Sequence, residues 1–413
     1  ALGRKRVTLA AMVRSPRYGV AGQSLLDGIE AVASRGDRRT FGAFEGLFSS
    51  DAVRAILERK YGPEHLWSPS KLETYAACPF RFFAENVLSL TPAPELALES
   101  DLARRGSVLH DTLARLYARL NAAAEEGGPA PTPTPQLIAQ RFQETLDAIV
   151  GSRPRRGLDG ALREVERRQI AGWAEKFSRQ HDDYDAAWRH LDSPLVPTYF
   201  EARFGPKHRR SESLDDASLS TEKPFELDVS GERMRFTGQI DRIDVGRVGD
   251  ALVFNVIDYK TSASARVKTD DVRAGLQIQL PLYAMAAAEL LLADKQAAAL
   301  SAGYWSIRGK GFAVGARSGG PLAIGEIRDG KVEVAAGWTQ LRQELLARIA
   351  EIVGGIRRGA FPVFNADHNC GQFCPLSTGC RIGHVRSLEK TWPTSDLSAD
   401  VADSADDENR NSS

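Results

Sequence analysis

The sequence predicts an α/β or α+β protein built around a mixed β-sheet. Amphipathic segments with a helical period occupy much of the region from residue 68 to about residue 190. Segments that alternate polar and apolar residues follow, mainly between residues 198 and 261. A helix, another strand and a strong final helix come next, an order that favours a sheet carrying helices on its faces.

The composition is that of an ordinary globular protein. The chain has 413 residues, enough for one large or two ordinary domains, and 42% of them are hydrophobic. Lys+Arg and Asp+Glu both number 54, so any DNA binding must use a local basic groove. We expect a cytoplasmic protein with no membrane partner, because no signal peptide or apolar span is present. The first residue is Ala1, and we therefore expect a fragment of a longer polypeptide.

Helices are expected from residue 68 onward. Ser68 can cap a helix with Pro69 in its first turn, or Ser70 and Glu73 can form a capping box. A stiff Pro-rich loop interrupts the helical region at residues 127–135. The helical period predicts further helices within 107–125, 136–150, 160–190, 276–292 and 338–353.

Strands are expected in the middle of the chain, where the period changes to two. The pattern predicts strands at 198–204, 225–229, 235–245, 251–261 and 302–307. A hairpin-like turn at 245–250 joins two of them, and residues 206–224 form a polar loop. The tail after about residue 388 is acidic, Ser-rich and poor in apolar residues, which is typical of disorder.

Acidic residues beside a lysine mark a candidate catalytic site. Asp258 and Lys260 are two apart at the end of an apolar strand, so they project from one face while Tyr259 points away. Asp241 lies on the preceding strand, and two carboxylates on neighbouring strands can hold a hard divalent cation. Such a metal would acidify a water molecule, and Lys260 could orient or deprotonate it or stabilise developing charge. His110 could add a nitrogen ligand from a helix.

Simpler interpretations exist for each of these residues. The triplet Asp258–Lys260 by itself is common and is usually a solvated strand end. A lone histidine such as His110 in an apolar helix is more often a core residue. Arg242 could contact a phosphate or simply pair with Asp244.

The four cysteines point to a second site. They are one distant thiol and a close group of three, at Cys78, Cys370, Cys374 and Cys380. This arrangement suits a tetrahedral metal or an iron–sulfur cluster that joins the two ends of the chain. Zinc sites usually take their ligands as two close pairs, so one plus three fits a [4Fe–4S] cluster better, with zinc as the rival. Four unrelated buried thiols are the simplest alternative.

Several motifs in a fixed order carry a family resemblance. They are G-S-V-L-H at 106–110, G-Q-I-D-R-I-D at 238–244, D-Y-K-T at 258–261 and Q-L-P-L-Y at 279–283. Together they resemble the RecB-type branch of the PD-(D/E)XK nucleases over about residues 66–385. The cysteine pattern is similar to that of iron–sulfur nucleases in this branch, especially the C-terminal nuclease domain of AddB-type helicase–nuclease subunits. One departure is the triplet spacing C-x3-C-x5-C, where the family has C-x2-C-x5-C.

The resemblance implies a restriction-endonuclease-like fold and roles for individual residues. His110, Asp241 and Asp258 would bind Mg2+ or Mn2+, and Lys260 would be the catalytic lysine. Glu201 matches an acidic position on an earlier strand and is a further candidate ligand. Gln279 and Tyr283 would match the family motif Q-x-x-x-Y and face the DNA. The [4Fe–4S] ligands would be the four cysteines, which would clasp the terminal helices.

The resemblance also implies a function. The chain would be a metal-dependent DNA nuclease, with exonuclease action expected, in an AddB-like subunit for double-strand break repair and recombination. Its partners would be DNA, as a single strand or duplex ends, and an AddA-like helicase–nuclease subunit. Alternatives are a stand-alone RecB-family exonuclease, and a non-catalytic DNA-binding or scaffold module with a four-cysteine zinc clasp. The expected domains are a helicase-like remnant at 1–66, the nuclease at 67–387 and a disordered tail at 388–413.

Overall fold

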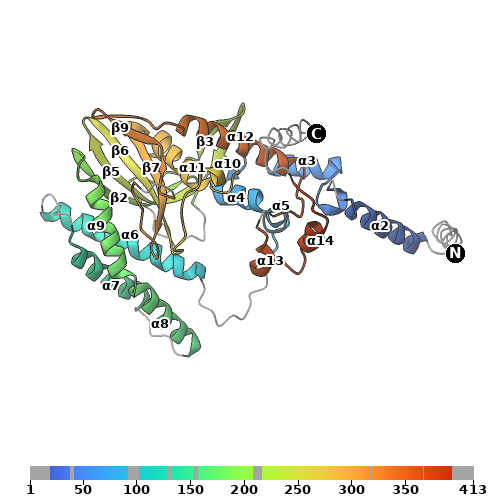
Figure 1. The fold of residues 1–413 in the computed structure, drawn as a ribbon, viewed down its shortest axis with the longest axis horizontal. Helices are drawn as coiled ribbons and strands as arrows, with labels where there is room; N and C mark the ends of the chain where they lie inside the picture. Colours follow the sequence, from blue (N-terminus) through green and yellow to red (C-terminus); the bar gives the residue numbers. More distant parts are fainter. Residues whose placement is uncertain are drawn as a thin grey trace, which may run out of the picture. The chain divides into compact units, whose positions relative to one another are not determined.

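The structure is a computed structural model that forms two compact units (Figure 1). It describes residues 19–37, 41–91, 102–127, 133–151, 157–207, 216–315, 319–365 and 367–392. One unit comprises 63–73 and 94–349, and the other comprises 1–62, 74–93 and 350–413. The predicted domain limits stay predictions, and most of the expected disordered tail, residues 393–413, lies outside the described residues.

A five-stranded mixed sheet forms the centre of the unit that contains residues 94–349. Its strands, in spatial order, are β2 (Ser193–Phe204), β5 (Gly238–Val248), β6 (Ala251–Lys260), β7 (Ala298–Ser306) and β8 (Leu322–Ala323). Strands β6 and β7 are parallel, whereas the other neighbouring pairs are antiparallel. The predicted mixed sheet and the predicted hairpin between β5 and β6 are therefore confirmed.

Three shorter strands form a second sheet and divide one predicted strand into two. They are β1 (Leu66–Trp67), β4 (Glu232–Phe236) and β3 (Phe225–Val229). The expected strand at 235–245 is wrong as a single element, because the chain changes sheet at Thr237. The Thr237 N–H donates to Trp67 O at 2.8 Å, while its hydroxyl donates to Phe204 O at 2.9 Å. The next residue, Gly238, has no Cβ, and a Cβ there would lie 2.5 Å from the Tyr283 ring.

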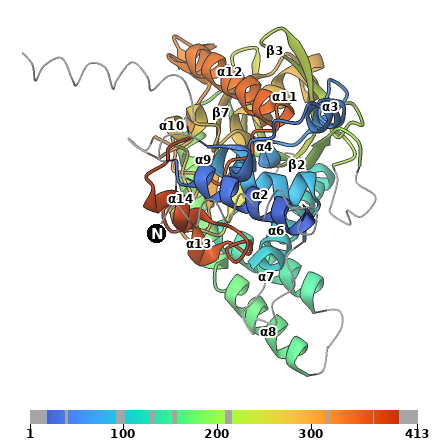
Figure 2. The same cartoon turned by 90° about the vertical axis from the view of Figure 1, so that its right-hand side faces the viewer.

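Four helices pack together beside the central sheet. They are α6 (Leu102–Gly127), α7 (Pro135–Val150), α8 (Leu158–Ala171) and α9 (Ala174–Trp188). Figures 1 and 2 show α7 and α8 extending away from the strands. Helix α6 begins five residues earlier than expected, and the expected helix at 160–190 is divided at Gly172 and Trp173. The buried core between these helices and the sheet includes Leu113, Phe142, Phe177, Ile257, Tyr259 and Trp305.

The remaining elements of this unit are short apart from one long helix. Helix α11 (Gln279–Ala286) continues into the π-helical turn η4 (Ala287–Leu291), and almost all of its side chains are buried. Helix α12 (Trp338–Arg357) begins where the sequence predicted and belongs to both units. Short elements that the sequence did not predict are α10 (Thr269–Arg273), η5 (Ala293–Lys295), β9 (Gly325–Arg328) and β10 (Lys331–Val334).

The other unit is helical. Its elements are α2 (Gly19–Arg35), η2 (Ala43–Glu45), α3 (Asp51–Lys60), the end of α4 (Pro69–Ala77), α5 (Pro79–Phe82), η3 (Phe83–Val87), α13 (Cys370–Phe373) and α14 (Ile382–Ser387). The aromatic residues near Cys78 pack here, with Phe82 stacked on Phe361. Tyr75 donates its hydroxyl hydrogen to Ala360 O at 2.7 Å. No helix among the described residues is long and apolar enough to cross a membrane.

Candidate active site

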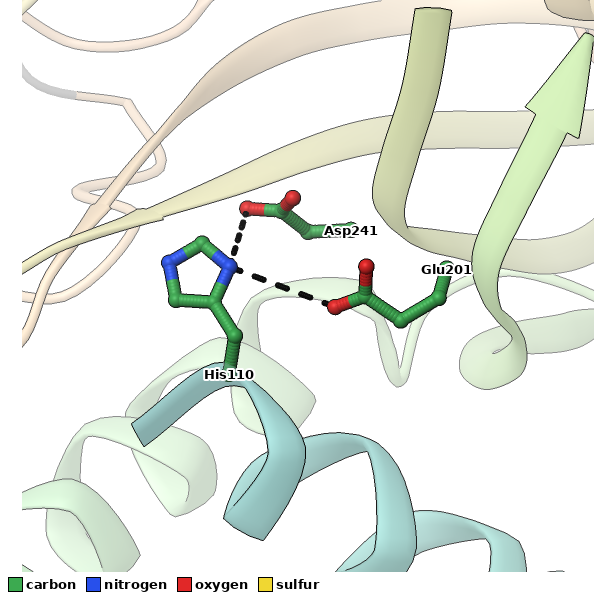
Figure 3. A group of neighbouring side chains, drawn as sticks. All are labelled: His110, Glu201 and Asp241. Carbon is green, nitrogen blue, oxygen red and sulfur yellow. Dashed lines mark ion pairs between the residues drawn. The ribbon is translucent and has the colours of Figure 1, made fainter. Parts of the chain in front are cut away.

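Three side chains from three elements converge on one point (Figure 3). His110 comes from α6, Glu201 from β2 and Asp241 from β5. The His110 Nδ1 atom lies 3.3 Å from Asp241 Oδ2 and 4.0 Å from Glu201 Oε1. One nitrogen or oxygen atom of each residue lies within 4.8 Å of the other two, a geometry that can hold a metal ion. We call this set the His–Glu–Asp group.

The backbone of Tyr259 fixes the orientation of this group. The His110 Nε2 atom lies 3.1 Å from the Tyr259 carbonyl oxygen, which can only accept a hydrogen bond. The hydrogen of a neutral His110 ring therefore lies on Nε2, which leaves the Nδ1 lone pair facing the two carboxylates. The Tyr259 N–H in turn donates to Asp241 Oδ2 at 2.8 Å. One peptide segment of β6 thus positions two of the three residues.

Glu201 has an unusual backbone conformation. Its φ of 55° lies in the left-handed region, which costs a non-glycine residue about 1–3 kcal/mol. Such strain persists only where the surrounding structure imposes it, and it concentrates at functional sites. The side chain is buried and points toward His110 (Figure 3). Glu201 was the least supported of the candidate ligands in the sequence, and the structure places it inside the group.

Asp258 and Lys260 form a second part of the site. The Lys260 Nζ atom lies 2.5 Å from Asp258 Oδ2, as two side chains on one strand face predict. Asp258 is buried, and its Oδ1 accepts a hydrogen bond from Gln279 Nε2 at 2.7 Å. The Lys260 side chain is 40% exposed, so its ammonium group is open to a substrate. Tyr259 points away into the helical core.

A carboxylate that sequence reasoning treated only as a helix cap orients Gln279. Glu73 Oε1 accepts the backbone N–H groups of Ile278 and Gln279, at 2.7 and 2.8 Å. It therefore fixes the start of α11, the helix that presents Gln279 to Asp258. Tyr283, expected to face DNA, is buried, and its hydroxyl accepts the Gln239 N–H at 3.4 Å.

The site is electrostatically crowded. Burial and the charge of Asp241 raise the pKa of Glu201 to about 9, and they raise the pKa of Asp258 to about 7 despite Lys260. Burial would lower the pKa of His110, but the neighbouring carboxylates outweigh it and raise this pKa to about 9. Protons therefore compensate the clustered negative charge when no cation does. A divalent cation would replace these protons, which makes the donor set a good fit for a metal.

A buried arginine connects the elements that carry the site. Arg242 is fully buried and pairs with Asp244 through two N–O contacts of 2.6 Å, so the alternative of a phosphate contact is wrong. Its Nη1 also donates to the hydroxyl oxygens of Tyr117 and Tyr259 at 3.1 Å. Tyr117 lies two helical turns after His110 on α6, and Tyr259 lies between Asp258 and Lys260. Sequence reasoning missed this positioning role.

The four cysteines meet at one cavity within the helical unit. Cys78, Cys370, Cys374 and Cys380 all line a cavity of about 200 Å³. Burial, followed by the neighbouring thiols, raises the pKa of Cys78 to about 11. The Arg81 backbone N–H donates to Cys78 Sγ, and the Arg386 side chain donates to Cys370 Sγ at 3.2 Å. Four sulfur donors around one cavity, with hydrogen bonds to two of them, fit a metal cluster.

Comparison with known proteins identifies relatives of the region that carries these sites. The family model of the PD-(D/E)XK nuclease superfamily matches residues 66–381. The chain is also similar to the AddB subunit of the ATP-dependent helicase/deoxyribonuclease from Staphylococcus aureus strains JH9, JH1 and N315, with 28% identity over 240 residues. The match covers 57% of this chain but 18% of each of these relatives, so the chain spans only a small part of their length.

Proposed function

Because this chain belongs to the PD-(D/E)XK nuclease superfamily, we propose that it is a metal-dependent nuclease that hydrolyses phosphodiester bonds in DNA. The convergence of His110, Glu201 and Asp241, next to the ion pair of Asp258 and Lys260, is the observation that carries the proposal. Asp241 and Asp258 lie on neighbouring strands, and Lys260 is the exposed cation beside them.

The donor set suits a hard divalent cation. One imidazole nitrogen and carboxylate oxygens favour Mg2+ or Mn2+, with His110, Glu201 and Asp241 as ligands and Asp258 nearby. Such a metal supplies an acidified water molecule and positive charge beside the phosphate. The chain supplies the orientation: the Tyr259 backbone fixes His110 and Asp241, while Gln279 and Lys260 hold Asp258.

Lys260 acts at the phosphate. The charge of Asp258 outweighs the effect of burial and raises the pKa of Lys260, so the ammonium form is favoured at neutral pH. A cation in this position can orient the attacking water and stabilise the negative charge that develops on the phosphate oxygens. We therefore assign Lys260 this role rather than that of a general base.

The proposal is tested by digestion of end-labelled single-stranded and duplex DNA. We expect no cleavage in EDTA and restored cleavage with Mg2+ or Mn2+, with short products released from DNA ends. An Asp241→Asn variant serves as the control for contaminating nucleases, because it keeps the shape of the side chain but removes a ligand charge. A folded, metal-supplied wild type that leaves both substrates intact would disprove nuclease activity.

The biological setting is a further proposal. The name of the relatives, which describes one subunit of an ATP-dependent helicase/deoxyribonuclease, supports an AddB-like subunit that acts with an AddA-like partner. Such a complex would work in double-strand break repair and recombination, in the cytoplasm. A stand-alone RecB-family exonuclease is the alternative, and copurification of the chain with its candidate partner distinguishes the two.

We further propose that the four cysteines bind a [4Fe–4S] cluster rather than zinc. Sulfur atoms that share one tetrahedral zinc ion lie about 3.8 Å apart, because each Zn–S bond is about 2.3 Å. The cavity that the four cysteines line has a volume of about 200 Å³. A single water needs only about 10–15 Å³ of such volume, so this space supports a group much larger than one ion.

Anaerobic purification is expected to yield a brown protein with about four irons per chain, as a cubane bound by four thiolates requires. Iron, sulfide and zinc are measured together on the same sample. Cys78→Ser should lose most of the iron, whereas substitution of an exposed residue outside the cavity, such as Ser50→Ala, should retain it. Stoichiometric zinc without sulfide would replace the cluster assignment with a zinc clasp.

Cys78→Ala is expected to lower the melting temperature and DNA affinity more than it changes the Mg2+ dependence of the residual cleavage. The reason is that the free energy of cluster binding is partly folding free energy. The cysteines and the His–Glu–Asp group also belong to different units. Thermal melting, DNA binding and Mg2+ titrations of the variant check this expectation. Unchanged melting and affinity with a complete loss of cleavage would instead place the cluster in the chemistry.

A further inference from the structure

A basic cleft lies between α9 and the loop that follows β7. Its volume is about 670 Å³, within the range of about 300–1,000 Å³ that is usual for ligand-binding pockets. Lys176 and Arg179 line it from α9, one helical turn apart, and Lys310 lines it from the loop. All three side chains are exposed, and the lining also includes one acidic residue, Asp183. The lining therefore carries an excess of positive charge.

The loop that carries Lys310 is held in a defined conformation. The buried side chain of Gln180 donates from Nε2 to the carbonyl oxygens of Ser306, Ile307 and Gly309, at 3.1–3.2 Å. Its Oε1 accepts the Trp305 indole N–H at 2.9 Å. The loop follows closely over Gln180 at Gly311, where φ is +67° and a Cβ would lie 3.0 Å from Gln180 Cβ. A cleft formed in advance loses little conformational entropy when a ligand binds.

The same loop begins beside the catalytic lysine. Ser306 is the partner of Lys260 in the register of β6 and β7, and the Ile307 N–H donates to Lys260 O at 2.9 Å. Lys310 lies three residues further on, a distance of at most about 11 Å along an extended chain. A polymer that passes Lys260 can therefore reach the cleft over a short distance.

We propose that this cleft binds the phosphates of a single DNA strand that continues from the cleavage site, a role that rests on the proposed nuclease function. Lys176, Arg179 and Lys310 would contact phosphate oxygens. The apolar lining, which includes Val314 and Ala187, would lie against sugars and bases. Cations that follow the backbone beside an apolar surface are the means by which proteins hold single strands without reading their sequence.

The test compares two double variants with the same change in charge. Arg179→Ala with Lys310→Ala removes two cations from the cleft. Arg328→Ala with Lys331→Ala removes two exposed cations from the β9–β10 hairpin and is the control. Binding of a labelled oligothymidine long enough to span both places is measured in EDTA at several salt concentrations. We expect about a tenfold loss of affinity in the cleft variant at low salt. The slope of log Kd against log salt should fall by about 1.4, since each single-strand phosphate contact contributes about 0.7.

Cleavage kinetics provide a second readout. With a long single strand and Mg2+, the cleft variant should show a raised KM and an unchanged kcat, and a substrate too short to reach the cleft should be cut as by wild type. Equal affinity and slope in the cleft and control variants, with active wild type, would overturn the role of the cleft alone. A loss confined to duplex DNA would overturn the single-strand assignment. A wild type that neither binds nor cuts DNA would overturn the proposed function and, with it, this inference.

Discussion

Lys260→Ala is expected to reduce DNA cleavage by about 10²- to 10³-fold or more, because removing one preorganised group that stabilises transition-state charge has an effect of this size. The Lys260 ammonium is the exposed cation of the site and lies 2.5 Å from Asp258. Its removal leaves Asp258 buried with Gln279 as its remaining hydrogen-bond donor. The rate of cleavage of end-labelled DNA at saturating Mg2+ is the measurement.

The loss should appear in kcat and not in folding. Lys260 is partly exposed, so its truncation creates no buried cavity, and the melting temperature should stay close to that of wild type. Lys295→Ala, which removes an exposed lysine that contacts Tyr199, is the matched control and should cut DNA normally. Cleavage by Lys260→Ala at the wild-type rate, with equal metal occupancy, would show that the proposed mechanism is wrong.

Arg242→Met is expected to produce the largest loss of stability among single substitutions in the sheet. Methionine fills part of the arginine volume but leaves Asp244 buried and unpaired, and breaking a buried ion pair costs about 3–5 kcal/mol. The arginine also lies over the rings of Tyr117 and Trp305, at 4.6 and 5.0 Å from their centroids. At roughly 2–4 °C per kcal/mol, the melting temperature should fall by about 10 °C.

A gentler substitution separates stability from positioning. Tyr259→Phe removes one hydroxyl that accepts from Arg242 but keeps the ring, the buried ion pair and the backbone that orients His110. Arg328→Met on exposed β9 should change the stability by less than about 0.5 kcal/mol. We expect Tyr259→Phe to weaken Mg2+ binding in a titration more than Arg328→Met does. Equal melting of Arg242→Met and wild type would contradict the role that we assign to this pair.

Much of the fold could be predicted because local patterns report local structure. Alternation along 251–261 predicted β6 to within a residue, and the turn at 245–250 predicted its pairing with β5. Helix α12 began where the period indicated. Very short elements such as β8, β9 and α10 escaped prediction, because so few residues hold no period and their conformation depends on neighbours distant in sequence.

The candidate site shows the same division between local and distant information. Spacing placed Asp258 and Lys260 on one face, and the antiparallel hairpin placed Asp241 on the neighbouring strand. The grouping of His110 with Glu201 and Asp241, and the capping of Gln279 by Glu73, needed the folded chain. No spacing rule connects residues that lie on different elements and approach one another only after the sheet and helices pack.

The sequence by itself determined the chemical inventory of this protein and the face on which each strand residue lies, since side-chain alternation is a property of the local backbone. It contained four cysteines in a one-plus-three pattern and an acid–x–lysine motif at a strand end. Tertiary structure alone decided that Arg242 is buried against Asp244 and that Glu201 takes a left-handed backbone. Burial and strain are imposed by packing between distant segments, and packing is a property of the whole fold rather than of any short stretch.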